Sequence, residues 1–146
     1  MRSKHLLILL GMLAASMFLF GFCFKKAGAI YQISPEHLHA IARVESGLDP
    51  SAMNQNLNGS YDIGLMQINS TWKKSLGGRW DHLSDPCYNV MVGSWILRQC
   101  MDRYGYSWDG VACYHTGKGL SDSGMKKQKL AKKYIRRVQT VLANNP

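Results

Sequence analysis

Acidic residues are scarce in this chain of 146 residues, where 9 Asp and Glu stand against 18 Lys and Arg and leave a formal charge of +9 at pH 7. This balance indicates an anionic partner, which can be nucleic acid, a membrane surface or a cell-wall polymer. Internal repeats and low-complexity stretches are also lacking, and the length excludes a multidomain enzyme. Hydrophobic residues make up 46% of the sequence, which excludes wholesale disorder.

The N-terminal segment differs from the rest of the chain because an apolar run from Leu6 to Phe22 contains no charged residue and follows Arg2 and Lys4. A short positive start before a hydrophobic stretch is typical of an export signal. We therefore predict an export signal over residues 1–22 and a mature domain over residues 23–146. The run is slightly short for a membrane-spanning helix, which needs about 20 residues. The cleavage position and an uncleaved membrane anchor stay open.

Cysteine is sparse, and the four residues Cys23, Cys87, Cys100 and Cys113 show no CxxC spacing of the kind found in zinc ribbons and thioredoxins. Their even number in an exported chain predicts two disulfides, with free buried thiols as the alternative. Cys87 and Cys100 are expected at opposite ends of one helix, roughly 20 Å apart, whereas a bridge needs Cα atoms within about 7 Å. Cys100 and Cys113 flank a short turn between two helices. We therefore predict Cys100–Cys113, which leaves Cys23–Cys87.

The remaining pattern predicts a mostly helical domain. One helix begins at Ser34-Pro35-Glu36, which supplies a capping Ser, a Pro at the first helical position and an acid in the first turn, and it ends before Gly47. A polar segment over 49–64 contains the hairpin turn signal Asn58-Gly59. We predict an α+β fold, predominantly α, with this one small β-element in a polar lobe. Helices are expected over 23–31, 35–46, 87–103, 108–116 and 126–143.

Glu45 is the first candidate for chemistry. It shares one face of its helix with Leu38, Ile41 and Ala42, so a carboxyl group ends an apolar stripe. It also lies in the last helical turn, where the helix dipole disfavours negative charge. Both effects raise the pKa of a carboxyl group, and a protonated carboxyl group near neutral pH is what a general acid requires. A glutamate that simply emerges into water at the helix end is the alternative.

Asp62 is the second candidate and lies in the polar segment, 17 positions after Glu45. Its Asn, Ser, Gly and Tyr neighbours predict an ionised carboxylate. Two carboxyl groups in opposed environments are the arrangement that cleaves glycosidic bonds in lysozyme. A turn-capping aspartate is the alternative, and for an isolated residue it would be the better interpretation.

The stretch Glu45-Ser46-Gly47 and the sequence NGSYDIGLMQINSTW over residues 58–72 resemble the soluble lytic transglycosylase family. In that family a Glu-Ser pair precedes a Gly-Leu-Met-Gln-Ile-Asn type segment. Further similarity lies in 85–87, 105–108 and 112–114, and the resemblance covers most of residues 23–140. It is closest to the small specialised members of the IagB/IpgF type, which accompany type III and type IV secretion, conjugation and pilus machines. It implies a lysozyme-like fold and a periplasmic enzyme that cleaves peptidoglycan.

The resemblance also implies roles for single residues. Glu45 would be the essential acid/base at the β-1,4 bond between MurNAc and GlcNAc, would give a 1,6-anhydro product and would be oriented by Ser46. Neither a metal nor a cofactor is expected, because carboxyl groups and a shaped groove suffice. Core packing is the alternative for Met66 and Tyr134. The implied substrate-binding residues, besides Ser46, are Gly64, Met66, Gln67, Asn69, Tyr114, His115, Gly117 and Tyr134.

Two positions depart from the family pattern. The family usually has Tyr-Asn-Ala-Gly where this chain has 114–117, so His115 replaces an Asn that contacts sugar and can add pH sensitivity. Asp62 is the other departure, because many transglycosylases lack this acid. The segment from Glu45 to Trp72 also resembles C-type animal lysozyme, which has a second acid at the same spacing. A hydrolase that uses Glu45 and Asp62 is therefore the alternative to a transglycosylase, which the rest of the chain favours.

The expected partners are peptidoglycan glycan strands and components of a cell-envelope secretion, conjugation or pilus machine. Eight bases and one acid lie in residues 118–137, which indicates a solvated helix face or attraction to an anionic glycan or membrane. A nucleic-acid-binding accessory has no recognition motif in its favour, and the membrane is expected only through an uncleaved leader. A non-catalytic glycan-binding assembly adaptor with the same fold is the remaining alternative.

Overall fold

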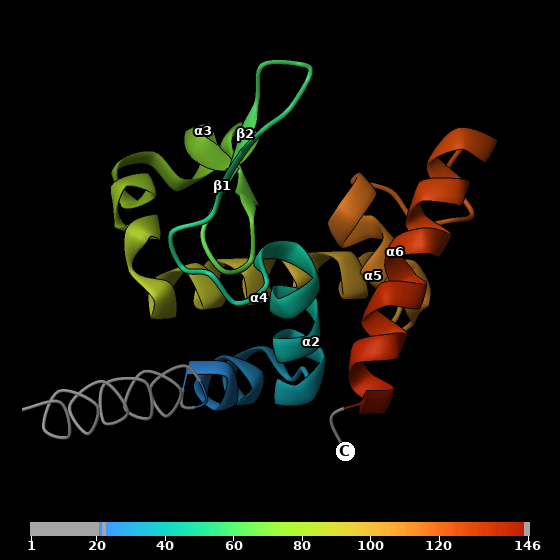
Figure 1. The fold of residues 1–146 in the computed structure, drawn as a ribbon, viewed down its shortest axis with the longest axis horizontal. Coiled ribbons are helices and arrows are strands. Elements are labelled where there is room, and N and C mark those ends of the chain that lie inside the picture. The colour runs from blue at the N-terminus through green and yellow to red at the C-terminus, as the bar shows by residue number, and fades with distance from the viewer. Residues whose placement is uncertain (1–20, 22, 145–146) are drawn as a thin grey trace, which may run out of the picture.

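The computed structural model describes residue 21 and residues 23–144 as a helical domain that carries a small sheet (Figure 1). The predicted export signal lies outside the described residues except for Gly21. Within the described part of the chain, none of the helices has the length and apolar character needed to cross a membrane.

The helices fall where the sequence predicts them. Residues 23–31 are helical, and α2 (Pro35–Ser46), α4 (Pro86–Tyr104), α5 (Trp108–Thr116) and α6 (Met125–Asn144) follow. The side chain of Ser34 accepts a hydrogen bond from the N–H of His37 and caps α2, as predicted. Gly47 ends the helix in the left-handed region, at φ 67°, and its N–H donates to the Arg43 carbonyl. Glu45 and Ser46 are therefore the last two residues of α2.

The sheet is larger than the predicted β-element. Strands β1 (Met53–Gln55) and β2 (Tyr61–Ile63) form the expected hairpin around Asn58-Gly59, and a third strand, β3 (Ile68–Asn69), pairs antiparallel with β2. The chain then continues through a 3-10 turn at Ser70–Trp72, the short helix α3 (Lys73–Leu76) and a 3-10 segment at Gly77–Ser84. The pattern predicted neither β3 nor these short turns, because none is long enough to show a hydrophobic period.

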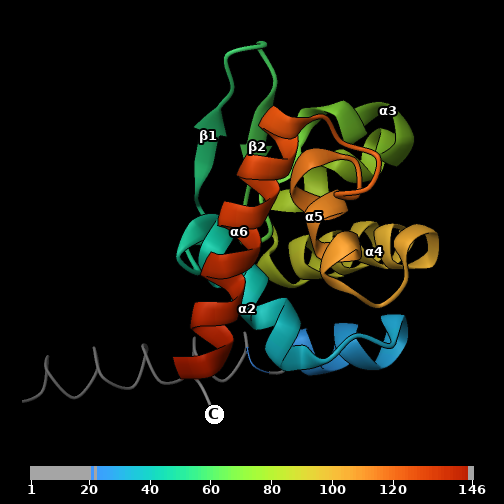
Figure 2. The same ribbon diagram turned by 90° about the vertical axis from the view of Figure 1, so that its right-hand side faces the viewer.

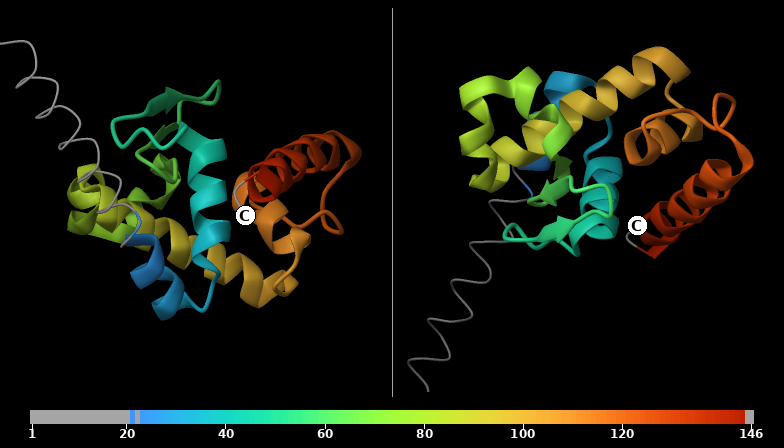
Figure 3. Two further views of the ribbon diagram at one scale, coloured as in Figure 1. Left: turned by 60° about the horizontal axis from the view of Figure 1, so that its bottom comes forward. Right: turned by 90° about the horizontal axis from the view of Figure 1, so that it is seen from above.

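The elements pack so that α2 lies between the sheet and α6 (Figure 3). Helix α6 packs against α2 and α5, and α5 packs in turn against α4 (Figure 2). The core at these contacts consists of fully buried apolar side chains from α2, the loop before β3, α4, α5 and α6. The largest of them include Leu38, Ile41, Leu65, Met66, Leu97, Val111 and Val138.

Both predicted disulfides are present. Cys23 pairs with Cys87, at a Cα–Cα distance of 5.3 Å, and Cys100 pairs with Cys113 at 5.6 Å. Both distances lie within the range that a disulfide requires. One bridge joins the N-terminal helical segment to the start of α4, and the other joins the end of α4 to α5. The two bridges therefore tie both ends of α4 to neighbouring helical segments.

Candidate active site

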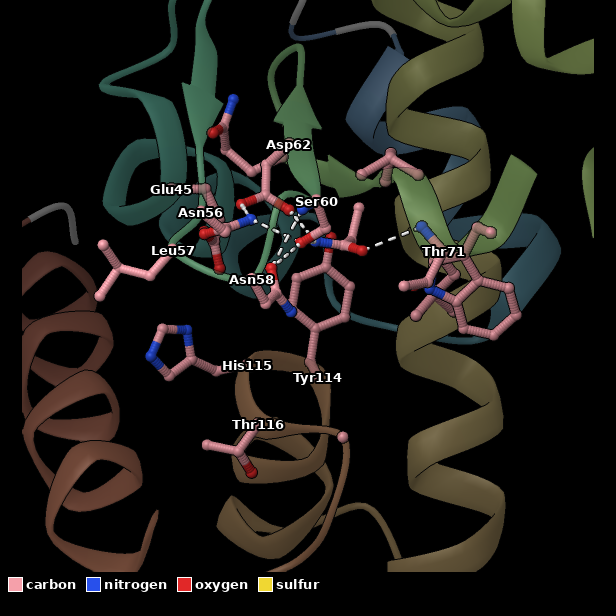
Figure 4. Close-up of a pocket in the computed structure, with 16 residues that line it drawn as sticks. Glu45, Asn56, Leu57, Asn58, Ser60, Asp62, Thr71, Tyr114, His115 and Thr116 are labelled. Atoms are coloured by element: carbon pink, nitrogen blue, oxygen red, sulfur yellow. Dashed lines mark hydrogen bonds between the residues drawn. The ribbon is translucent and has the colours of Figure 1, made fainter. Parts of the chain in front are cut away.

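A cleft of about 700 Å³ opens between the sheet and the end of α5, and the end of α2 reaches into it. Both predicted carboxyl groups line this cleft, with Asp62 on the sheet side and Tyr114 and His115 on the opposite side (Figure 4). The lining residues are Glu45, Asn56, Leu57, Asn58, Ser60, Asp62, Gln67, Ile68, Asn69, Thr71, Trp72, Ile96, Tyr114, His115, Thr116 and Gly117.

Glu45 keeps only part of its surface exposed to the cleft. Burial raises the pKa of its carboxyl group to about 7, and the negative charge of Asp62 adds to this increase. A hydrogen bond that the Tyr134 hydroxyl donates to Glu45 Oε1, at 2.6 Å, lowers the pKa, as does the positive charge of Arg137. Burial prevails, and the group is divided between its acid and its base forms near neutral pH.

Asp62 has a different environment, within strand β2 and not in a turn. The side-chain amide of Asn69, its cross-strand partner on β3, donates to Asp62 Oδ1 at 2.7 Å. The amide of Asn56 donates to Oδ2 at 2.8 Å. Each carboxylate oxygen therefore has an amide donor, which fixes the orientation of the group in the cleft. The contrast predicted between the two carboxyl groups is present: Glu45 packs against a buried tyrosine and Asp62 lies among polar side chains.

The predicted substrate-binding residues divide into two sets. Those that line the cleft are Gln67, Asn69, Tyr114, His115 and Gly117. Four others lie behind the cleft wall and act on its shape from there: Ser46, Gly64, Met66 and Tyr134.

Ser46 joins the end of α2 to the loop that precedes β3. Its Oγ lies 2.9 Å from the carbonyl oxygen of Leu65 and 3.2 Å from that of Ala42, so its single proton is shared between two acceptors. This contact fixes the backbone next to Glu45 relative to the sheet lobe.

We expect Ser46→Ala to lower the free energy of unfolding by about 1 kcal/mol, because one net hydrogen bond is lost and a carbonyl group in the interior loses its partner. Urea denaturation followed by circular dichroism measures this change. Ser75→Ala, at an exposed position of α3, is the matched control and should leave the midpoint unchanged. Equal midpoints for both variants would contradict the linking role of Ser46.

The loop over residues 63–66 is fixed to α4 by Asn89, a fully buried residue that sequence reasoning missed. Its amide donates to the Ile63 carbonyl at 3.0 Å, and its carbonyl accepts from the Met66 N–H at 2.8 Å. Gly64, at φ 77°, permits this approach, because a Cβ there would lie 2.2 Å from Asn89 Nδ2. The only available signal was an amide side chain within an otherwise apolar helix.

Two tyrosine hydroxyls form hydrogen bonds that hold parts of the site in place. The Tyr114 hydroxyl donates to the Met66 carbonyl at 2.6 Å, while the Met66 side chain lies fully buried in the core. Tyr134 is buried, and its ring stacks on His115 with centroids 4.1 Å apart and planes 3° apart. Partial removal from water and the charge of Arg137 lower the pKa of His115, although Asp62 opposes them. The neutral imidazole of His115 therefore predominates at pH 7. It stacks on Tyr134, whose hydroxyl holds Glu45.

The tip of the β1–β2 hairpin and the turn after β3 also contribute lining residues that the pattern did not single out. Leu57 is fully exposed at the hairpin tip. Trp72 lines the cleft, and its ring meets that of Trp95 edge-to-face with centroids 5.3 Å apart. Among residues 21 and 23–144, no group of three or more His, Cys, Asp or Glu side chains is placed to hold a metal ion.

Comparison with known proteins supplies independent likenesses. Residues 22–136 match the model of the family described as Transglycosylase SLT domain. The chain is 41% identical over 110 residues to Invasion protein IagB of Salmonella typhimurium, an alignment that covers 73% of this chain and 69% of that protein. It is 40% identical over 116 residues to Protein IpgF of Shigella flexneri, with coverage of 77% and 73%. A putative peptidoglycan-binding-like protein of Escherichia coli K12 is 34% identical over 124 residues, with coverage of 77% and 78%.

Proposed function

Because the chain belongs to the transglycosylase SLT domain family, we propose that it is a peptidoglycan lytic transglycosylase in which Glu45 is the only acid/base. The bond cleaved is the β-1,4 linkage between MurNAc and GlcNAc. The observation that carries this proposal is the carboxyl group of Glu45, which faces the cleft with a pKa raised to about 7. A general acid works best when its pKa lies near the operating pH.

The reaction divides into two proton transfers by one group. Tyr134 occupies Glu45 Oε1, so Oε2 is the oxygen that meets the substrate. The protonated carboxyl group gives its proton to the glycosidic oxygen, the C1–O bond breaks, and positive charge develops on the MurNAc ring. The carboxylate then removes the proton from the 6-hydroxyl of the same sugar, whose oxygen bonds to C1. The 1,6-anhydro ring forms, and Glu45 is protonated again.

Asp62 supports a second candidate, a lysozyme-type hydrolase. Its carboxylate lines the same cleft and raises the pKa of Glu45 through its charge. In that reaction Asp62 would stabilise the sugar cation, and a water activated by Glu45 would finish the cleavage. Because both oxygens of Asp62 already accept amide hydrogen bonds, its contribution would be electrostatic stabilisation of the cation. This charge can serve either reaction.

The cellular setting is part of the proposal. We infer export by residues 1–22 to the periplasm, where the domain over residues 23–146 would open the cell wall locally for a secretion, conjugation or pilus apparatus. The likeness to a protein named for invasion supports this setting. A relative named as peptidoglycan-binding-like supports the adaptor alternative, but an adaptor would have no use for a carboxyl group with a raised pKa in a cleft.

Mass spectrometry of purified peptidoglycan digested by the wild-type protein tests the reaction. We expect 1,6-anhydromuramic ends on the released fragments, whereas reducing ends would assign the hydrolase and no release would favour the adaptor.

Asp62→Asn belongs in the same experiment: we expect about a tenfold slower release with the same anhydro ends, since a charge that stabilises the cation is lost. An unaltered rate would reduce Asp62 to a structural residue of β2.

A further inference from the structure

A second concavity, of about 1000 Å³, lies between the end of α2 and the neighbouring face of α6. Six bases line it: Arg43, Lys126, Lys129, Lys133, Arg136 and Arg137. No acidic side chain lines it, and its exposed apolar surface includes Leu130, which is 51% exposed. We call this feature the cationic groove.

No base of the cationic groove forms an ion pair with an acidic side chain within the described part of the chain. The ion pair found among those residues joins Arg98 to Asp102 at the far end of α4, and it includes no base of the groove. Arg137 donates instead to the Val44 backbone carbonyl at 2.9 Å, which holds its guanidinium at the α2 side of the groove. Several bases of one sign in a concave surface focus a positive potential and attract anions.

The cationic groove adjoins the reacting group. Val44, which lines the groove, directly precedes Glu45, which lines the cleft. Arg137 lines the groove, and its charge lowers the pKa of Glu45. Lys133 lines the groove as well, and the next residue on α6, Tyr134, donates its hydroxyl hydrogen bond to Glu45 Oε1. Two pairs of consecutive residues, Val44 with Glu45 on α2 and Lys133 with Tyr134 on α6, therefore connect the cationic groove to the cleft.

We propose that the cationic groove binds the carboxylate-bearing peptide stems of peptidoglycan while the glycan strand lies in the cleft. This inference rests on the proposed function. The stem leaves the MurNAc ring beside the cleaved bond, and it combines free carboxylates with alanine methyl groups. Lysine and arginine side chains match the carboxylates, and the exposed Leu130 matches the methyl groups. A groove suits an extended peptide, whereas a bilayer surface would require a flat or convex basic face.

Binding tests this proposal separately from catalysis if every protein carries Glu45→Gln. The probes are soluble, uncross-linked glycan strands that keep their peptides and the same strands after an amidase has removed them. We expect the Glu45→Gln protein to bind the peptide-bearing strands about tenfold more tightly. Adding Lys129→Glu and Lys133→Glu should remove this preference and leave affinity for stripped strands unchanged. Adding Lys74→Glu and Arg103→Glu, at exposed positions outside both cavities, is the charge-matched control and should keep it.

The outcomes separate this inference from the proposed function. Equal affinity for both kinds of strand in all three proteins would overturn the groove proposal even if the wild-type digest contains anhydro ends. Equal loss of affinity for stripped and intact strands in the groove variant would also overturn it, because the bases would then contact glycan. A third result would also overturn the proposal: the groove variant keeps its preference for peptide-bearing strands but no longer adsorbs to vesicles of anionic phospholipid. A preference that the groove variant alone loses supports the proposal, whether or not the wild-type digest shows cleavage.

Discussion

Glu45→Gln should abolish clearing of purified peptidoglycan, with a loss in rate of about 10²- to 10⁴-fold. The amide has the size of the carboxyl group and can still accept the hydrogen bond from Tyr134 through its carbonyl oxygen. It cannot give a proton to the glycosidic oxygen or take one from the 6-hydroxyl, so both halves of the reaction fail. The measurement is the decrease in turbidity of a peptidoglycan suspension, with released fragments counted by mass spectrometry.

Glu36→Gln is the matched control for this loss. Glu36 is the other glutamate of the chain and lies in the first turn of the same helix, exposed and far along α2 from the cleft. The substitution makes the same change of charge and shape, so its clearing rate should equal that of the wild-type protein. Undiminished clearing by Glu45→Gln would refute the assignment of Glu45, and equal losses in both variants would indicate a general effect of charge.

The sequence was sufficient for the long elements and for the two carboxyl groups because their signals are local. Capping residues at the start of α2 and the glycine after it fix the two ends of this helix. Glu45 is thereby placed in the last helical turn, where the apolar stripe ends. The turn signal Asn58-Gly59 likewise places Asp62 on the returning strand of a hairpin. The spacing of the cysteines restricted the pairings enough to give both disulfides.

The supporting residues of the site could not be predicted in this way because their roles depend on partners far along the chain. Tyr134 meets Glu45 across 89 positions, and Tyr114 reaches the Met66 carbonyl across 48. A helical period places Tyr134 on the buried face of α6 but does not show which residue it touches. Asn89 fixes the loop at residues 63–66 through bonds that exist only once α4 passes beneath the sheet lobe. Gly64 allows Asn89 to pack closely against the loop. The motif predicted a sugar contact at Gly64 and gave no sign of this packing role.

Burial of Glu45 has a cost in stability, and Glu45→Gln should therefore stabilise the protein while it removes activity. The pKa of Glu45 is about 7 in the folded state and 4.5 in the unfolded chain, so burial of the ionised group costs about 3 kcal/mol above pH 7. Below pH 4.5 the carboxyl group is protonated in both the folded and the unfolded state, and this cost vanishes. Wild-type stability should decline as pH rises from 4.5 through 7, relative to Glu45→Gln, whose amide does not titrate.

Urea unfolding of the wild-type protein and of Glu45→Gln at pH 4, 6 and 8 measures this difference in the free energy of unfolding. We expect Glu45→Gln to be little different from wild type at pH 4 and more stable by about 3 kcal/mol at pH 8. Glu36→Gln should show the opposite sign, because the Ser34 hydroxyl bonds to the Glu36 carboxylate and lowers its pKa in the folded state. Its contribution is present above pH 4.5 and is lost as pH falls through the lowered pKa. A stability gain at Glu45 that is the same at all three pH values would mean that packing, and not the buried charge, causes it.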